Sequence, residues 1–159
     1  MPRILIVAYG NPLRCDDGVA WLAADKLENT FPESEVEILR LHQLAPEVAE
    51  AVRHRNLVVF LDAALDDTNN GQPGQIRVKE LSPDPSEKDP VGPFSHVYSP
   101  IKILEISRQL YQASPKAYVI TVTGGNFDHG DRPSDAVAAA IPSVVTKVAE
   151  VVRGQLSNP

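Results

Sequence analysis

Short runs of apolar residues alternate with polar segments along the chain and predict a sheet. Residues 4–7 and 57–61 are apolar throughout, which is typical of parallel strands buried on both faces. Residues 75–81 instead alternate apolar and polar side chains, as in a strand with one exposed face. This segment follows the preceding strand after a short turn at Asn69-Asn70-Gly71, so we expect it to be antiparallel and at an edge. We expect five strands, at residues 4–7, 36–41, 57–61, 75–81 and 118–122.

Between these strands the apolar positions recur with helical spacing. We expect helices from residue 19, near 46–55, from Ser99 to about 113, and from Ser134 onwards, with Pro142 kinking or dividing the last one. The order of elements predicts an α/β protein, a three-layer αβα sandwich with a five-stranded, mostly parallel sheet. At 159 residues, the whole chain (1–159) is expected to form a single domain.

Two adjacent carboxylates, Asp16 and Asp17, follow the first strand after the turn Gly10-Asn11-Pro12. In open α/β sheets, ligands bind in the crevice at the carboxyl ends of the strands. An acidic residue at this place can also simply cap the following helix, because the amino end of a helix is positive. Position alone leaves both interpretations open.

Further polar residues follow the other strands. Asp62 ends the third strand, and His96 follows a proline-rich loop at 82–95 that is long enough to be functional or mobile. Carboxylates and an imidazole that meet in space could hold a divalent first-row ion. Aspartates at strand ends and histidines in loops are also common without any such role. His42 and His129 flank strand ends as well, and either entry into the site or plain solvation fits them.

Composition narrows the function classes. The net charge of −6 and the pI near 5.1 argue against a phosphate-binding surface, and so against a nucleic-acid partner. The chain contains neither a G-x-x-x-x-G-K-[ST] loop nor a G-x-S-x-G elbow. The single cysteine excludes an internal disulfide. With no signal peptide and no apolar run of membrane length, we expect a cytoplasmic protein without a membrane partner.

The single cysteine, Cys15, suggests another site. It could act as a nucleophile with His96 and Asp62, which would make the protein a Cys-His hydrolase. Its acidic neighbours Asp16 and Asp17 should raise the pKa of the thiol and oppose thiolate formation. A non-enzymatic, flavodoxin-like binding module is a further alternative.

Residues 10–18, Gly-Asn-Pro-Leu-Arg-Cys-Asp-Asp-Gly, resemble the G-N-x-L-x-x-D-[DE]-G signature of the [NiFe]-hydrogenase maturation endopeptidases. The apolar strand ending in Asp62-Ala63, His96 before a helix, and Pro133-Ser134 at the start of the last helix extend the resemblance over nearly the whole chain. Enzymes of this family remove a C-terminal extension from the hydrogenase large subunit after nickel insertion. The resemblance therefore implies a metal-dependent or aspartic-type peptidase whose partner is that precursor, and which works on nickel that the precursor carries.

The resemblance also implies roles for individual residues. Asp17 and Asp62 match the two acidic metal ligands of the family, and His96 matches the imidazole. Asp16 or Asp17 could serve as the general base for water. Two stretches depart from the family pattern. Residues 41–47 replace the D-G-G-T-x-G segment that some members carry, and residues 124–129 replace the usual glycine-x-x-proline stretch.

Overall fold

A computed structural model describes residues 1–65, 71–82 and 98–158. The loop expected at 82–95 and His96 therefore lie outside the described residues, apart from Ser82, and so does most of the turn expected at 69–71. Within the described part of the chain, no helix is both long and apolar enough to cross a membrane.

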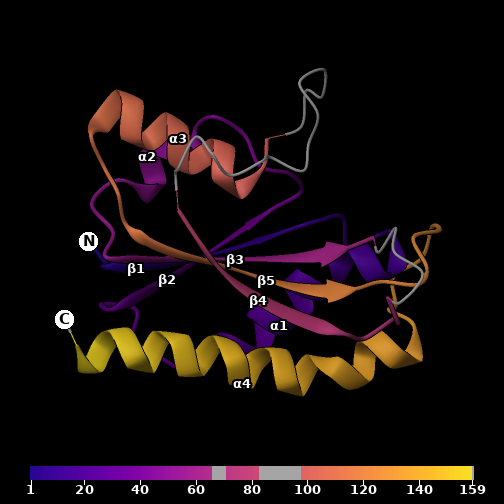
Figure 1. Ribbon diagram of the computed structural model, residues 1–159. Coiled ribbons are helices and arrows are strands. Elements are labelled where there is room, and N and C mark those ends of the chain that lie inside the picture. Colours follow the sequence, from indigo (N-terminus) through magenta and orange to yellow (C-terminus); the bar gives the residue numbers. More distant parts are fainter. Residues whose placement is uncertain (66–70, 83–97, 159) are drawn as a thin grey trace.

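The sheet has five strands in the order β2-β1-β3-β5-β4 (Figure 1). The strands β1, β2, β3 and β5 pair in parallel, and β4 pairs antiparallel with β5 at one edge. The antiparallel edge strand was expected, but its partner is β5 and not the strand that precedes it. The strand bounds are Ile4–Tyr9 for β1, Val36–Leu41 for β2, Leu57–Ala64 for β3, Ile76–Leu81 for β4 and Lys116–Thr123 for β5.

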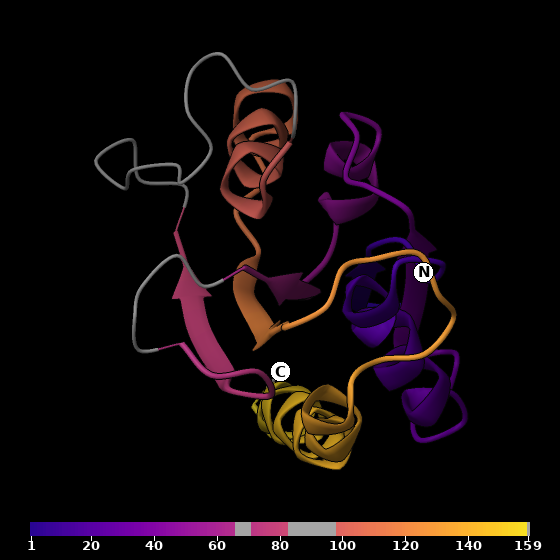
Figure 2. The ribbon, with the colours of Figure 1, turned by 90° about the vertical axis from the view of Figure 1, so that its right-hand side faces the viewer.

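Helices cover both faces of the sheet, which confirms the three-layer αβα architecture. The helices α1 and α4 lie on one face, and α2 and α3 lie on the other (Figures 1 and 2). The helix bounds are Val19–Leu27 for α1, Val48–Val52 for α2, Pro100–Tyr111 for α3 and Asp135–Ser157 for α4, and a short 3-10 helix, η1, spans Cys15–Gly18.

Some boundaries differ from the expected ones. The helix α2 is only five residues long, and β3 continues two residues beyond Asp62. The helix α4 is continuous through Pro142, so of the two expected outcomes, a kink or a division, the division is wrong. Its valines, such as Val144 and Val148, are buried against the sheet, and this packing outweighs the backbone hydrogen bond that a proline cannot donate.

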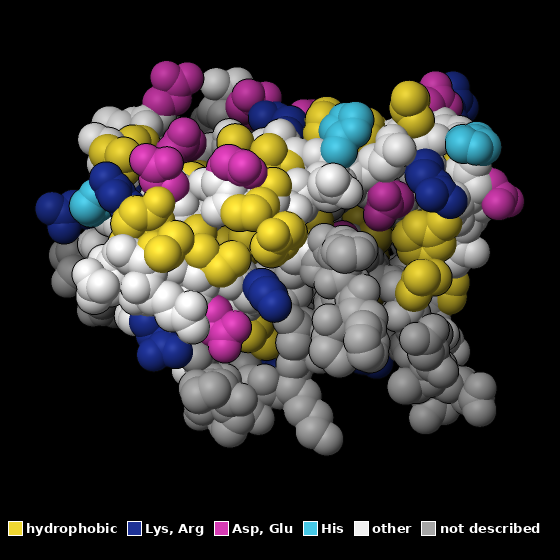
Figure 3. Space-filling view, turned by 90° about the horizontal axis from the view of Figure 1, so that it is seen from above, with side chains coloured by type: hydrophobic (Ala, Val, Ile, Leu, Met, Phe, Trp, Pro, Cys, Tyr) yellow, Lys and Arg dark blue, Asp and Glu magenta, His cyan; other side chains and the backbone are white. Residues whose placement is uncertain are grey.

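The core has one apolar cluster on each side of the sheet. On the α1/α4 side it includes Ile6 and Val59, and on the α2/α3 side it includes Val7 and Phe60. The two sets alternate along β1 and β3 because successive side chains of a strand point to opposite faces. Seen from the α2/α3 side, the surface carries acidic, basic and apolar side chains mixed together (Figure 3).

Candidate functional site

Two loops meet at the carboxyl edge of the parallel strands. The first loop (residues 10–18) follows β1, and the last loop (residues 124–134) follows β5. Figure 2 looks onto this edge and shows the orange last loop crossing to the indigo first loop before it returns to α4. The two loops come from opposite ends of the chain, and they lie where ligands bind in open α/β sheets.

Asp16 joins the two loops. It is 0% exposed, and its carboxylate accepts hydrogen bonds from the backbone N–H groups of Gly125 (2.8 Å), Asn126 (2.9 Å) and Ser134 (2.6 Å). The Ser134 hydroxyl donates a fourth bond, at 2.9 Å. Burial alone would raise the pKa of Asp16, but these four donors stabilise the anion more strongly, and the pKa is lowered.

Main-chain hydrogen bonds extend this contact. The N–H of Cys15 donates to the carbonyl of Gly130 at 2.9 Å, and the N–H of Gly130 donates to the carbonyl of Leu13 at 2.9 Å. The Arg14 Nε–H donates to the carbonyl of Phe127 at 3.1 Å. Together with Asp16, these bonds make the first and last loops one structural unit.

Asp17 points away from this junction and folds back onto its own loop. Its Oδ2 accepts a hydrogen bond from the backbone N–H of Asn11 at 2.8 Å, and its side chain is partly exposed. Gly10, with φ +145°, makes this fold possible, because a Cβ there would lie 2.1 Å from the Asp17 carbonyl oxygen. The tight turn therefore places the Asp17 carboxylate at the end of β1.

Asp16 and Asp17 lie in the first turn of η1, which leads into α1, but neither caps α1 with its side chain. The N-cap of α1 is Gly18, which has no side chain, and neither aspartate bonds the first turn of that helix. The helix α3 begins at Ser99 as expected, and Ser99 is its N-cap, because its hydroxyl accepts the N–H of Lys102. Ser134 occupies the N-cap position of α4, but its hydroxyl binds Asp16 instead.

Asp62 lies on β3, beside the end of β1. Since Ala8 pairs with Leu61, Tyr9 and Asp62 are the next residues along two adjacent parallel strands. The Tyr9 hydroxyl and the backbone N–H of Ala63 stabilise the Asp62 anion and act to lower its pKa. Burial and the nearby charge of Asp17 nevertheless raise the pKa of Asp62 to about 7.

Asp17 and Asp62 thus lie close enough for the charge of one to affect the pKa of the other. Tyr9 completes this cluster and was missed by the sequence analysis. Burial, followed by the negative charges of Asp62 and Asp17, raises the pKa of Tyr9 well above its usual value, so the hydroxyl stays protonated and acts as a donor. The one signal in the sequence that could have pointed to Tyr9 was its polar hydroxyl at the end of an otherwise apolar strand.

The proposed metal site can be followed only in part. His96 lies outside the described residues, and among the residues that the structure does describe no three His, Cys, Asp or Glu side chains are placed to hold a metal ion. His42 is exposed, with its ring 5.3 Å from that of Trp21, and His129 is exposed in the last loop. The three-ligand set of Asp17, Asp62 and His96 stays a prediction.

Cys15 is poorly placed for a nucleophile. It is 9% exposed and lies under Gly130, where an added Cβ would come within 2.7 Å of the Cys15 Sγ. The carboxylate that follows it, Asp16, is turned into the last loop and fully engaged there. This packing argues against the Cys-His hydrolase. The flavodoxin-like binding module stays an untested alternative.

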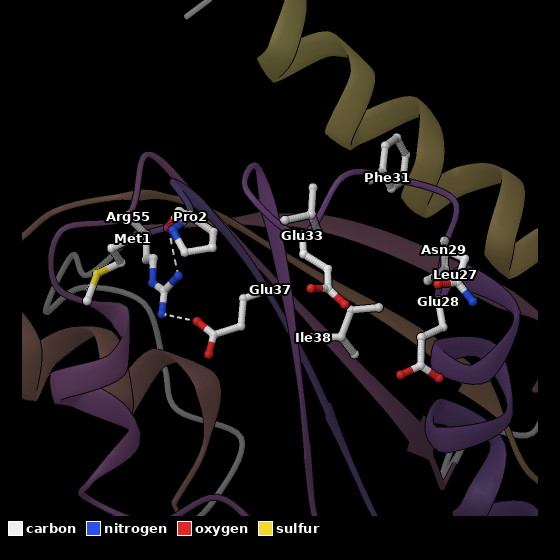
Figure 4. Close-up of a pocket in the computed structure, with 11 residues that line it drawn as sticks. Met1, Pro2, Leu27, Glu28, Asn29, Phe31, Glu33, Glu37, Ile38 and Arg55 are labelled. Carbon is white, nitrogen blue, oxygen red and sulfur yellow. Dashed lines mark hydrogen bonds and ion pairs between the residues drawn. The ribbon is translucent and has the colours of Figure 1, made fainter.

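A separate pocket of about 590 Å³ lies at the opposite, amino end of the strands, between β2, the end of α1 and the N-terminus (Figure 4). Its buried cation, Arg55, donates to the carbonyls of Pro2 (2.7 Å) and Ala51 (2.8 Å) and forms an ion pair with Glu37. These bonds occupy the guanidinium and fix the N-terminus to the sheet. We therefore assign this pocket no chemistry.

No family model matches the chain, and no curated protein matches its sequence. Solved structures match its fold over almost the whole length. The hydrogenase maturating endopeptidase HybD from E. coli aligns with a TM-score of 0.75 at 20% identity, over 96% of this chain and 93% of that one. The chain has the hydrogenase maturation endopeptidase fold.

Two archaeal structures extend this likeness. The [NiFe] hydrogenase maturation protease HycI from Thermococcus kodakarensis aligns with a TM-score of 0.69 at 20% identity, over 95% of this chain and 92% of that one. The hydrogenase 2 maturation peptidase from Thaumarchaeota archaeon SCGC_AB-539-E09 aligns with a TM-score of 0.68 at 19% identity, over 94% of this chain and 97% of that one. Within the maturation endopeptidase fold, the pair of Asp17 and Asp62 occupies the carboxyl edge of β1 and β3.

Proposed function

We propose that this protein is an endopeptidase that removes the C-terminal extension of a nickel-loaded [NiFe]-hydrogenase large-subunit precursor in the cytoplasm. The observation that carries the proposal is the pair of interacting carboxylates, Asp17 and Asp62, at the edge where open α/β sheets bind ligands. Support comes from the resemblance of residues 10–18 to the family signature and from the fold shared with proteins named as hydrogenase maturation peptidases.

The chemistry of the two carboxylates suits a divalent ion that arrives with the substrate. Among the described ion pairs, none involves Asp17 or Asp62, so the negative charge at this edge has no described cation to balance it. Carboxylate oxygens are suitable ligands for first-row divalent metals. Nickel on the precursor would supply the missing positive charge, and His96 is the proposed third ligand.

The protein's own residues would then divide the work. Asp17 and Asp62 would hold the ion, and Asp17 would also serve as the general base for water, as considered from the sequence. We assign Asp16 a different role from the general base considered from the sequence. Both of its oxygens are occupied by hydrogen bonds to the last loop, so it holds the two loops together.

The test is a cleavage assay with the purified protein and a large-subunit precursor, prepared with and without nickel. We expect loss of the C-terminal extension, detected by mass spectrometry, from the nickel-loaded form only. Asp62→Asn should stop this cleavage while the protein stays folded. Asp128→Asn, an exposed aspartate in the last loop, is the matched control and should cleave normally.

The outcomes separate the parts of the proposal. If neither form of the precursor is cut, the endopeptidase function is wrong. If the nickel-free precursor is cut as fast as the loaded one, the protein is a peptidase but does not use nickel to recognise its substrate.

A further inference from the structure

Tyr9 occupies a position that the proposed chemistry does not yet use. It is the last residue of β1, one residue before the first loop begins. Its ring packs against the core cluster on the α2/α3 side, which includes Val7 and Phe60, and Asp62 is its neighbour on the adjacent strand. The ring is thus fixed by apolar packing, and its hydroxyl acts on the charge of Asp62.

The strand register explains why Tyr9 and Asp62 are neighbours. The strands β1 and β3 pair without interruption from Ile4↔Leu57 to Ala8↔Leu61, so the relative heights of Tyr9 and Asp62 are set by the sheet itself. Both continue the alternation that places Val7 and Phe60 on the α2/α3 side. Neither residue belongs to a loop, so the contact depends on the rigid part of the fold.

We propose that Tyr9 is a positioning residue for the proposed reaction: its hydroxyl, with the Ala63 N–H, holds the Asp62 carboxylate in a fixed orientation toward Asp17, so that the two carboxylates receive a divalent ion together. The inference rests on the proposed function for its substrate. It adds a residue that the family signature, which begins at Gly10, does not contain.

The physical reason is preorganisation. Partners that hydrogen-bond to a metal-binding carboxylate hold it in one rotamer, and their removal commonly costs about 10–100-fold in metal affinity or activity. A tyrosine hydroxyl suits this task because it donates one hydrogen bond and carries no charge that would repel a cation. Asp17 is held in the same way by a neutral donor, the N–H of Asn11.

The decisive variant is Tyr9→Phe, which removes the hydroxyl and keeps the packed ring. Titration of the isolated protein with Ni²⁺ alone, followed by calorimetry, should show about tenfold weaker binding than in the wild type. In precursor cleavage, kcat should fall by a similar factor while KM for the precursor stays near the wild-type value, because Tyr9 orients Asp62 and does not bind the peptide.

Two comparisons separate positioning from a general effect on folding. Tyr118→Phe is the matched control, since Tyr118 is a partly buried tyrosine on β5 that packs on the opposite face of the sheet. It should leave Ni²⁺ affinity and kcat unchanged. In an Asp62→Ala background, Tyr9→Phe should have no further effect on Ni²⁺ affinity, because the hydroxyl acts through Asp62.

Equal Ni²⁺ affinity in Tyr9→Phe and the wild type would overturn the inference, and so would cleavage by Tyr9→Phe at the wild-type kcat. A wild-type protein that binds Ni²⁺ more tightly than Tyr9→Phe but cuts no precursor would contradict the proposed function and leave the positioning role supported. The two failures are therefore distinguishable.

Discussion

Replacement of Asp16 by asparagine should destabilise the protein more than any ordinary surface change. Asparagine keeps the shape of aspartate but replaces one acceptor oxygen with an NH₂ group. In one amide orientation this group faces the N–H of Ser134, and in the other it faces the N–H groups of Gly125 and Asn126. At least one buried donor therefore loses its acceptor in either case.

The size of the effect follows from these bonds. One lost hydrogen bond to a charged acceptor costs about 1.5–3 kcal/mol, and the three remaining bonds weaken by roughly 0.5–1 kcal/mol each when the acceptor becomes neutral. The free energy of unfolding should therefore fall by about 3–6 kcal/mol. For a urea dependence of about 2 kcal/mol per molar, the midpoint should move down by roughly 2 M.

The assay is urea unfolding at pH 7, followed by the fluorescence of the single tryptophan, Trp21. Because the pKa of Asp16 is lowered in the folded state, its contribution is fully present above the usual aspartate pKa of about 3.9 and is lost as the pH falls through the lowered value. The difference between the variant and the wild type should shrink accordingly in acid. Asp128→Asn should change stability by less than about 0.5 kcal/mol. An Asp16→Asn midpoint equal to that of the wild type would refute the reasoning.

Three further predictions concern the same edge of the sheet. The pKa of Asp62 is raised in the folded state, so the wild type loses stability as the pH rises from about 4 to 7, where Asp62 ionises in the unfolded chain but not in the folded one. In thermal melts, Asp62→Asn should therefore be as stable as the wild type near pH 4. At pH 8 it should be more stable than the wild type by up to about 4 kcal/mol, at 1.4 kcal/mol per pKa unit. Gly10→Ala should lower the free energy of unfolding by more than about 2 kcal/mol, because the new Cβ would lie 2.1 Å from the Asp17 carbonyl oxygen. Gly154→Ala, in open space on α4, should instead raise the free energy of unfolding by up to about 1 kcal/mol. Equal urea midpoints for the two variants would contradict this prediction. Cys15→Ala should leave precursor processing largely intact, and inactivation by a thiol reagent with protection by substrate would show otherwise.

Much of the fold could be predicted because local patterns carry it. The alternation and apolar runs located all five strands, and β2 was expected at the residues where it occurs, Val36–Leu41. The start of α3 at Ser99 could also be predicted, because a capping hydroxyl accepts a hydrogen bond from a backbone N–H only three residues further along the chain. Where local preference and tertiary structure agree, the sequence is sufficient.

The candidate site was less accessible from the sequence. The donors to Asp16 lie 109 to 118 residues further along the chain, so local reasoning could only interpret Asp16 as a cap or a catalytic group. Tyr9 was missed for a related reason, since its contact with Asp62 depends on how two strands are paired. Ser134 shows the same competition, because a distant carboxylate takes the hydroxyl that a local rule assigned to the helix end.

The junction between the first and last loops has a consequence for the order in which the protein becomes active. A ribosome makes Asp16 near the start of synthesis and the N–H groups that bind it more than a hundred residues later. The parallel strands β1, β2 and β3 can pair while the rest of the chain is still being made, but the first loop has no anchor until β5 has joined the sheet. Contacts this distant in sequence form late and slowly. A nascent or truncated chain would therefore carry both proposed ligands, Asp17 and Asp62, without the framework that fixes them, and the peptidase site would be completed only when the whole domain is present.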